Sequence, residues 1–152
     1  DGEGLPTQKR MIVQDGVLMG WTLDLATGRK LGMPSTANAA RGTSSPPSPA
    51  TSNIDLTPGD LSRDALLSQM GTGLLVTSLI GSTINPTTGD YSRGASGFWV
   101  EGGQVKYPVN ECTIAGNLRE MLRSMIAAND ARAHLSTRVP SLLVEGLTLA
   151  GE

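Results

Sequence analysis

His134 and Cys112 are the side chains best suited to hold a metal or to act as a nucleophile, and each is the only residue of its type in the chain. A tetrahedral zinc site usually draws its four ligands from several histidines and cysteines. Two such residues without paired spacing do not make that pattern. We therefore predict no metal site in this chain, with Cys112 as a small buried residue and His134 as a solvated one.

Motifs of common catalytic and phosphate-binding sites are missing from the sequence as well. Neither a Gly-x-Ser-x-Gly nucleophile elbow nor a Gly-x-x-x-x-Gly-Lys-Ser/Thr phosphate loop occurs. The stretch Gly-Ala-Ser-Gly at 94–97 is expected in a strand, where small residues let two backbones approach. We predict no catalytic residue and no cofactor in this chain.

The polar segment 85–96 is the candidate for contact with a peptide or a partner protein. We expect it to form a loop between two strands, and binding residues tend to collect in loops on a rigid scaffold. A solvated hairpin loop is the alternative, because turn chemistry alone explains most of these residue types. The candidate binding residues are Asn85, Thr88, Tyr91, Ser92 and Arg93.

The sequence predicts hairpins and strands that would position the segment 85–96. Asp15-Gly16 between two apolar stretches predicts a hairpin with a type I′ turn. Alternation of apolar and polar residues over 21–25 predicts a half-buried strand. A second hairpin is expected around 101–103. The apolar run 74–80 predicts a buried strand.

Two helices are expected. Ser62 begins a short one that ends at Met70. A longer helix over 118–128 begins at Asn117, which with Glu120 makes a capping box. Its apolar stripe is expected to pack against a sheet, through Leu118, Leu122, Met125 and Ile126.

These elements predict an α+β domain of mainly antiparallel β structure, with a barrel-like sheet, hairpins, one long and one short helix. We expect residues 1–152 to form a single domain. The stretch 26–53, rich in Ser, Thr, Gly and Pro, is either a disordered linker or a long ordered loop.

Composition limits the classes of function. Twelve basic and fourteen acidic residues give a net charge of −2, which argues against direct nucleic-acid binding. The single cysteine rules out a disulfide within the chain and favours a reducing compartment, so we expect a cytoplasmic protein. No apolar run approaches the ~20 residues of a membrane span.

Several stretches together resemble the C-terminal third of the PmbA/TldD family, described as modulators of DNA gyrase and as a peptide-processing metalloprotease pair. The Gly-Ala-Ser-Gly-Phe-Trp at 94–99 is more similar to the PmbA branch, also called TldE. The matching stretches are 16–20, 28–33, 35–42, 45–49, 73–77, 85–99, 113–118 and 140–147.

The resemblance implies a partner subunit. The TldD branch carries zinc on a His-Glu-x-x-x-His helix completed by a cysteine near the C-terminus. Neither matches here, because no such motif occurs and Cys112 lies before the position of the family's cysteine. The chain is then expected to be a scaffold and interface domain, paired with a zinc-bearing TldD-like subunit or with itself, that acts on unfolded peptides.

Two other functions stay open. The full-length protein is itself a zinc metallopeptidase whose ligands lie upstream, or it is a regulator of DNA gyrase. In each case the fragment is expected to associate, because removing two thirds of a protein uncovers apolar surface.

Overall fold

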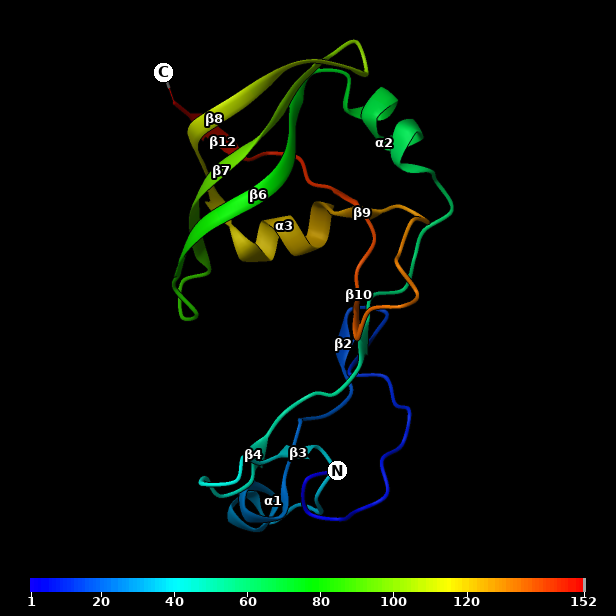
Figure 1. Cartoon of the computed structure of the whole chain (residues 1–152), viewed down its shortest axis with the longest axis vertical. Coiled ribbons are helices and arrows are strands. Elements are labelled where there is room, and N and C mark those ends of the chain that lie inside the picture. The colour runs from blue at the N-terminus through cyan, green and yellow to red at the C-terminus, as the bar shows by residue number, and fades with distance from the viewer. Residues whose placement is uncertain (152) are drawn as a thin grey trace. The chain divides into compact units, whose positions relative to one another are not determined.

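The computed structural model describes residues 1–151, apart from the side chains of Ser82 and Thr83. The chain separates into two compact units, Asp1–Ile54 and the residues from Asp55 onward (Figure 1). Each is described by itself below. The single-domain organisation stays a prediction.

The first unit contains the predicted hairpin. β1 (Val13–Gln14) pairs antiparallel with β2 (Val17–Leu18). Asp15 and Gly16 between them have φ of 50° and 77°, the positive angles that a type I′ turn requires at both central positions. The Asp-Gly signal is therefore confirmed.

A helix follows where the sequence predicted a strand and a loop. α1 (Leu25–Leu31) begins at Asp24, whose carboxylate accepts a 2.6 Å hydrogen bond from the Thr27 N–H. It ends at Gly32, in the left-handed region with φ 66°. The strand predicted over 21–25 is wrong, because Asp24 caps a helix in the middle of the alternating pattern.

The rest of the stretch 26–53 is ordered. β3 (Ala39–Ala40) pairs antiparallel with β4 (Ser48–Pro49), so the end of the proline-rich run is a short strand. The structure therefore favours the ordered loop over the disordered linker.

A four-stranded antiparallel sheet dominates the second unit (Figure 1). The order is β12-β8-β7-β6, which confirms the α+β class and its mainly antiparallel β content. A barrel-like sheet was expected. The observed sheet is open, with β6 and β12 at its two edges. The strands are β6 (Gly73–Ile84), β7 (Asp90–Glu101), β8 (Gln104–Asn117) and β12 (Thr148–Ala150).

The predicted second hairpin joins β7 to β8. Glu101 pairs with Gln104, and Gly102 and Gly103 between them have φ of 57° and 75°. These two strands extend well beyond the apolar residues that predicted them, because ladder pairing continues through their polar ends.

β6 is not the buried strand that its apolar run predicts. It lies at the sheet edge, and Leu79 and Ile80 are 38% and 67% exposed. A run of seven apolar residues is compatible with a central or an edge strand, because periodicity does not reveal how many neighbours a strand has.

Two small apolar clusters hold the second unit together. Tyr91 and Ala95 of β7 pack with Cys112 and Ile114 of β8, and Met121 packs against them. The other cluster consists of Leu66, Ala128 and Leu143, with Met70 and Ile126 alongside.

Close backbone approach explains one of the glycines of β7, Gly97. A Cβ at Gly97 would lie 1.9 Å from the carbonyl oxygen of Leu75 in β6, so only glycine fits there. The expected strand at 94–97 is confirmed, and the backbones approach closely at Gly97.

α2 (Arg63–Met70) confirms the predicted short helix, and the Ser62 hydroxyl accepts a 3.1 Å hydrogen bond from the Ala65 N–H. Its buried residue is Leu66, which is 4% exposed. The short connections β5 (Ile54–Asp55) and β10 (Thr137–Arg138) lie outside the main sheet, and Asp55 forms a 2.7 Å ion pair with Arg138.

α3 (Leu118–Ser124) is shorter than the predicted helix over 118–128. Met125 is extended, and β9 (Ile126–Ala127) pairs with β11 (Leu142–Leu143). The expected burial of the stripe is wrong in part, because Leu122 is 58% exposed and Met121 supplies the contact to the sheet instead.

The described part of the chain therefore has three short helices rather than one long and one short helix. None of them is long and apolar enough to cross a membrane.

Candidate binding site

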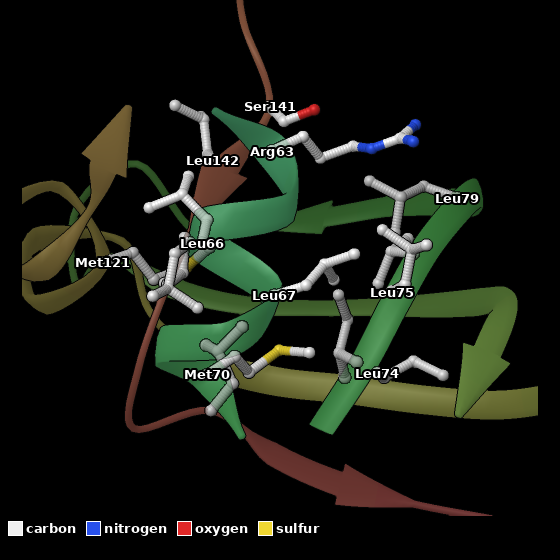
Figure 2. Close-up of a pocket in the computed structure, with 15 residues that line it drawn as sticks. Arg63, Leu66, Leu67, Met70, Leu74, Leu75, Leu79, Met121, Ser141 and Leu142 are labelled. Carbon is white, nitrogen blue, oxygen red and sulfur yellow. The ribbon is translucent and has the colours of Figure 1, made fainter. Parts of the chain in front are cut away.

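An apolar cavity of about 260 Å³ lies between α2 and β6 in the second unit. Figure 2 shows Leu67 and Met70 of α2 facing Leu74 and Leu75 of β6 across it. A helix presents residues three and four apart on one face, so Leu66, Leu67 and Met70 point to the same side. The remaining lining is Arg63, Val76, Leu79, Ile114, Met121, Ser141, Leu142, Leu143, Val144 and Leu147.

Polar groups lie at the rim of the cavity. Arg63 and Ser141 are its only polar lining residues among those the structure describes (Figure 2). Arg63 is exposed, with its Nε 3.8 Å from the Asp64 carboxylate. The cavity is therefore suited to an aliphatic or aromatic side chain with polar groups near its entrance.

Asp130 fixes the C-terminal wall of this cavity. Its carboxylate accepts 2.7 Å hydrogen bonds from the Ser141 N–H and the Ser141 hydroxyl. These two hydrogen bonds lower the pKa of Asp130 below its ordinary value of 3.8, and the positive charge of Arg63 adds to the effect. The ionised carboxylate thus holds the segment that leads into β11.

We expect Asp130→Asn to be less stable than the wild type at pH 7 and to approach it at pH 3. The pKa of Asp130 is lower in the folded state, so the carboxylate stabilises the fold above its unfolded-state pKa and ceases to do so as the pH falls through the folded-state pKa. Urea midpoints at both pH values measure the difference. Ser141→Ala, which keeps the backbone N–H, should reproduce part of it. An equal gap at both pH values would contradict the assignment.

Asn85 and Thr88, two of the predicted binding residues, lie in the turn between β6 and β7. The Asn85 Oδ1 accepts hydrogen bonds from the Thr87 N–H at 2.9 Å and the Thr88 N–H at 3.2 Å. The Thr88 hydroxyl donates to the Asp90 carboxylate at 2.7 Å. Both side chains are exposed and stabilise the turn, and their role in binding stays a prediction.

Tyr91, Ser92 and Arg93 do not lie in the expected loop, because β7 begins at Asp90. Tyr91 is 8% exposed and belongs to the core cluster with Ala95. Ser92 and Arg93 are half-buried. Within the described residues the five predicted residues thus divide between an exposed turn and a strand, and do not form one loop surface.

The structure does not bring together Cys112 and His134, the two side chains best suited to hold a metal. Cys112 is 5% exposed, and its thiol donates to the Ala95 carbonyl oxygen at 3.0 Å, while His134 lies in an exposed loop. No group of three or more His, Cys, Asp or Glu residues gathers among residues 1–151. The residues present therefore do not fit a zinc site.

The sequence pattern does not predict the cavity. Leu66, Leu67 and Met70 show a helical apolar spacing that signals a buried face, but spacing does not distinguish a filled contact from a hollow one. The opposite wall comes from strands and from the C-terminal segment, which the sequence does not place beside α2.

Comparison with known proteins places this chain in a metallopeptidase family. The chain belongs to the family of the PmbA/TldA metallopeptidase C-terminal domain, whose model matches residues 1–151. The resemblance inferred from the sequence is thereby confirmed.

Several of the relatives carry the PmbA name, and others are named TldD homolog. The chain is 46% identical to a metalloprotease PmbA homolog of Haemophilus influenzae, over 99% of this chain and 32% of that protein. The crystal structure of TldE from Thermococcus kodakarensis is similar to this chain, with a TM-score of 0.85 at 26% identity, over 98% of this chain and 35% of that one. A second solved structure is similar as well.

This second structure is that of a protein from Bacteroides thetaiotaomicron described as a modulator of DNA gyrase. Its TM-score is 0.83 at 34% identity, over 100% of this chain and 32% of that chain. The chain thus spans about a third of the length of the proteins it matches.

Proposed function

We propose that this chain is the scaffold and interface domain of a PmbA (TldE)-like subunit in a peptide-processing metalloprotease complex. A TldD-like subunit supplies the zinc and the catalytic residues, and unfolded peptides are the substrates. The complex works in the cytoplasm and makes no direct contact with nucleic acid.

The donor set of the chain is the observation that carries this proposal. Cys112 is buried with its thiol bonded to a backbone carbonyl, and His134 is exposed on a separate loop. A catalytic zinc site needs three protein ligands around one open position, and these residues do not supply them. Peptide hydrolysis would then depend on ligands outside this domain.

The edge of the main sheet supports a role in holding an extended chain. β6 has a neighbour on one side within the sheet, and its Leu75 and Leu79 line the cavity. An extended segment can add to such an edge through main-chain hydrogen bonds while a side chain enters an adjacent pocket. An unfolded peptide or a strand of the partner subunit has this chemistry.

A reconstitution experiment tests the proposal. Full-length protein is assayed for zinc content and for cleavage of an unfolded peptide, alone and with a TldD-like subunit. We expect cleavage only in the mixture, with the zinc in the TldD-like subunit. Cleavage and stoichiometric zinc in the full-length protein alone would instead identify an independent metallopeptidase, and salt-dependent DNA binding would favour the gyrase regulator.

Matched variants test the cavity within the same assay. Leu67→Lys places a charge in the apolar lining, and we expect it to reduce cleavage by about tenfold or more, the scale of a lost apolar contact. Leu122→Lys makes the same change on the exposed side of α3, outside the lining, and should leave cleavage unchanged. Equal rates for both variants would remove the cavity from the proposal.

A further inference from the structure

The β1–β2 hairpin exposes an unusual amount of apolar side chain. Six large apolar residues on and beside it are each 50–61% exposed. Single exposed apolar residues are normal in proteins, whereas a concentration of them is typical of an interaction surface. We call this group the hairpin patch, and it consists of Met11, Val13, Val17, Leu18, Met19 and Trp21.

Apolar residues occupy both faces of the hairpin. Val13 lies directly opposite Leu18, and Gln14 lies opposite Val17. Because successive residues of a strand point to opposite faces, Leu18 and Val17 belong to different faces. The hairpin patch therefore cannot be covered by packing on one side only.

The hairpin also lacks the devices that protect exposed strands. A two-stranded hairpin is marginally stable by itself, and exposed edges are usually blunted by proline or by charged residues such as lysine. Between Met11 and Trp21 the only charged residue is Asp15, at the tip of the turn, and the Arg10 guanidinium lies beside the patch, where it donates to the Trp21 carbonyl oxygen at 2.9 Å. The surface that covers the patch is accordingly expected to be mainly apolar.

The lengths of the relatives point to the covering segment. The chain matches a C-terminal domain and about a third of the length of its relatives, so most of a full-length relative lies N-terminal to the matched region. Such a segment would be tethered only ten residues from Met11. A short tether gives an effective concentration in the millimolar range, which a second molecule does not match.

The first residues of the chain are held in the same unit as the hairpin. The Gly2 N–H donates to the Ala39 carbonyl oxygen at 2.7 Å, and the Asp1 carboxylate accepts from the Leu5 N–H at 2.9 Å. The point at which a preceding segment would join the chain therefore lies on this unit.

We propose that the part of the full-length protein preceding Asp1 covers the hairpin patch, with apolar residues on both faces of the hairpin and a β-strand along one of its edges. The inference depends on membership of the family and on the described residues. It does not depend on the proposed role in a protease complex.

Photocrosslinking in the full-length protein tests this assignment. A benzophenone amino acid replaces Val17, and the crosslinks are mapped by mass spectrometry at a concentration where light scattering shows a monomer. We expect crosslinks to peptides that precede Asp1. The same amino acid at Thr43, an exposed residue of the same unit outside the patch, should give at least tenfold less of these products.

Several outcomes would overturn the inference. Crosslinks to residues after Asp55 would show that the second unit covers the patch. Crosslinks between two copies, or products formed only after a TldD-like subunit is added, would assign it to a subunit interface. The absence of any crosslink from position 17 would show that the patch is open to solvent. Because no peptide is cleaved in this experiment, its result is separate from that of the reconstitution.

Discussion

Replacing Leu66 by alanine will lower the free energy of unfolding by about 2–5 kcal/mol. Leu66 is 4% exposed, and it joins α2 to Ala128 and Leu143 in the second core cluster. Truncation removes buried methyl groups and enlarges a space that already adjoins a cavity, so the surroundings do not collapse to fill it. Urea denaturation of the 152-residue chain, followed by circular dichroism, measures the loss.

Leu122→Ala is the matched control for this experiment. It removes the same atoms from a helical leucine that is 58% exposed, and we expect a loss below about 1 kcal/mol, since surface substitutions have small effects. A larger loss for Leu122→Ala than for Leu66→Ala would mean that α3 and not α2 carries the packing, and equal losses would mean that burial does not distinguish the two leucines.

Gly97→Ala is the second change with a large expected effect. The added Cβ would lie 1.9 Å from the Leu75 carbonyl oxygen and 3.0 Å from the Val76 Cα. Both are backbone atoms, so a side-chain rotation cannot relieve the overlap and β6 must move away from β7. Overpacking costs about 1–3 kcal/mol and sometimes more. We expect the upper end, seen as a lower melting temperature.

Gly94→Ala makes the same chemical change three residues earlier on β7. Its added Cβ would meet the Ile80 Cβ at 3.5 Å, an ordinary contact. We expect Gly94→Ala to melt within a few degrees of the wild type. If Gly97→Ala melts there too, the close approach of β6 and β7 is not rigid.

Features with a local physical cause could be predicted from the sequence. The Asp15-Gly16 turn and the Ser62 cap depend on residues within three positions of each other, and both occur as expected. The hairpin at Gly102 and Gly103 follows the same logic. Turn and cap chemistry acts over one turn of chain, so it does not need tertiary information.

Features that depend on neighbours distant in the chain could not be predicted from the sequence. The number of strands beside β6 decides the exposure of Ile80, and nothing in its own sequence encodes that number. The apolar stripe at Leu122 was real as a pattern, but β9 begins at Ile126 because it pairs with β11. Tertiary pairing ended the helix early.

The candidate site divides in the same way. The turn at Asn85 could be predicted from its residue types, whereas the cavity needs α2, β6 and the segment at Ser141 to meet. Tyr91 was expected in a loop because it follows dense turn residues. Ladder pairing with β8 starts at Asp90, one residue earlier, and places Tyr91 in the core.

Asn117 joins two elements that are distant in the chain. Its Oδ1 accepts from the Arg119 N–H to begin α3, and its Nδ2 donates to the Thr88 carbonyl oxygen in the turn between β6 and β7. The Leu118 N–H donates to the neighbouring Gly89 carbonyl oxygen at 2.7 Å. A residue inserted into that turn would withdraw both acceptors from the first turn of α3. Length variation among natural relatives should therefore avoid this turn and accumulate in loops such as the one that carries His134.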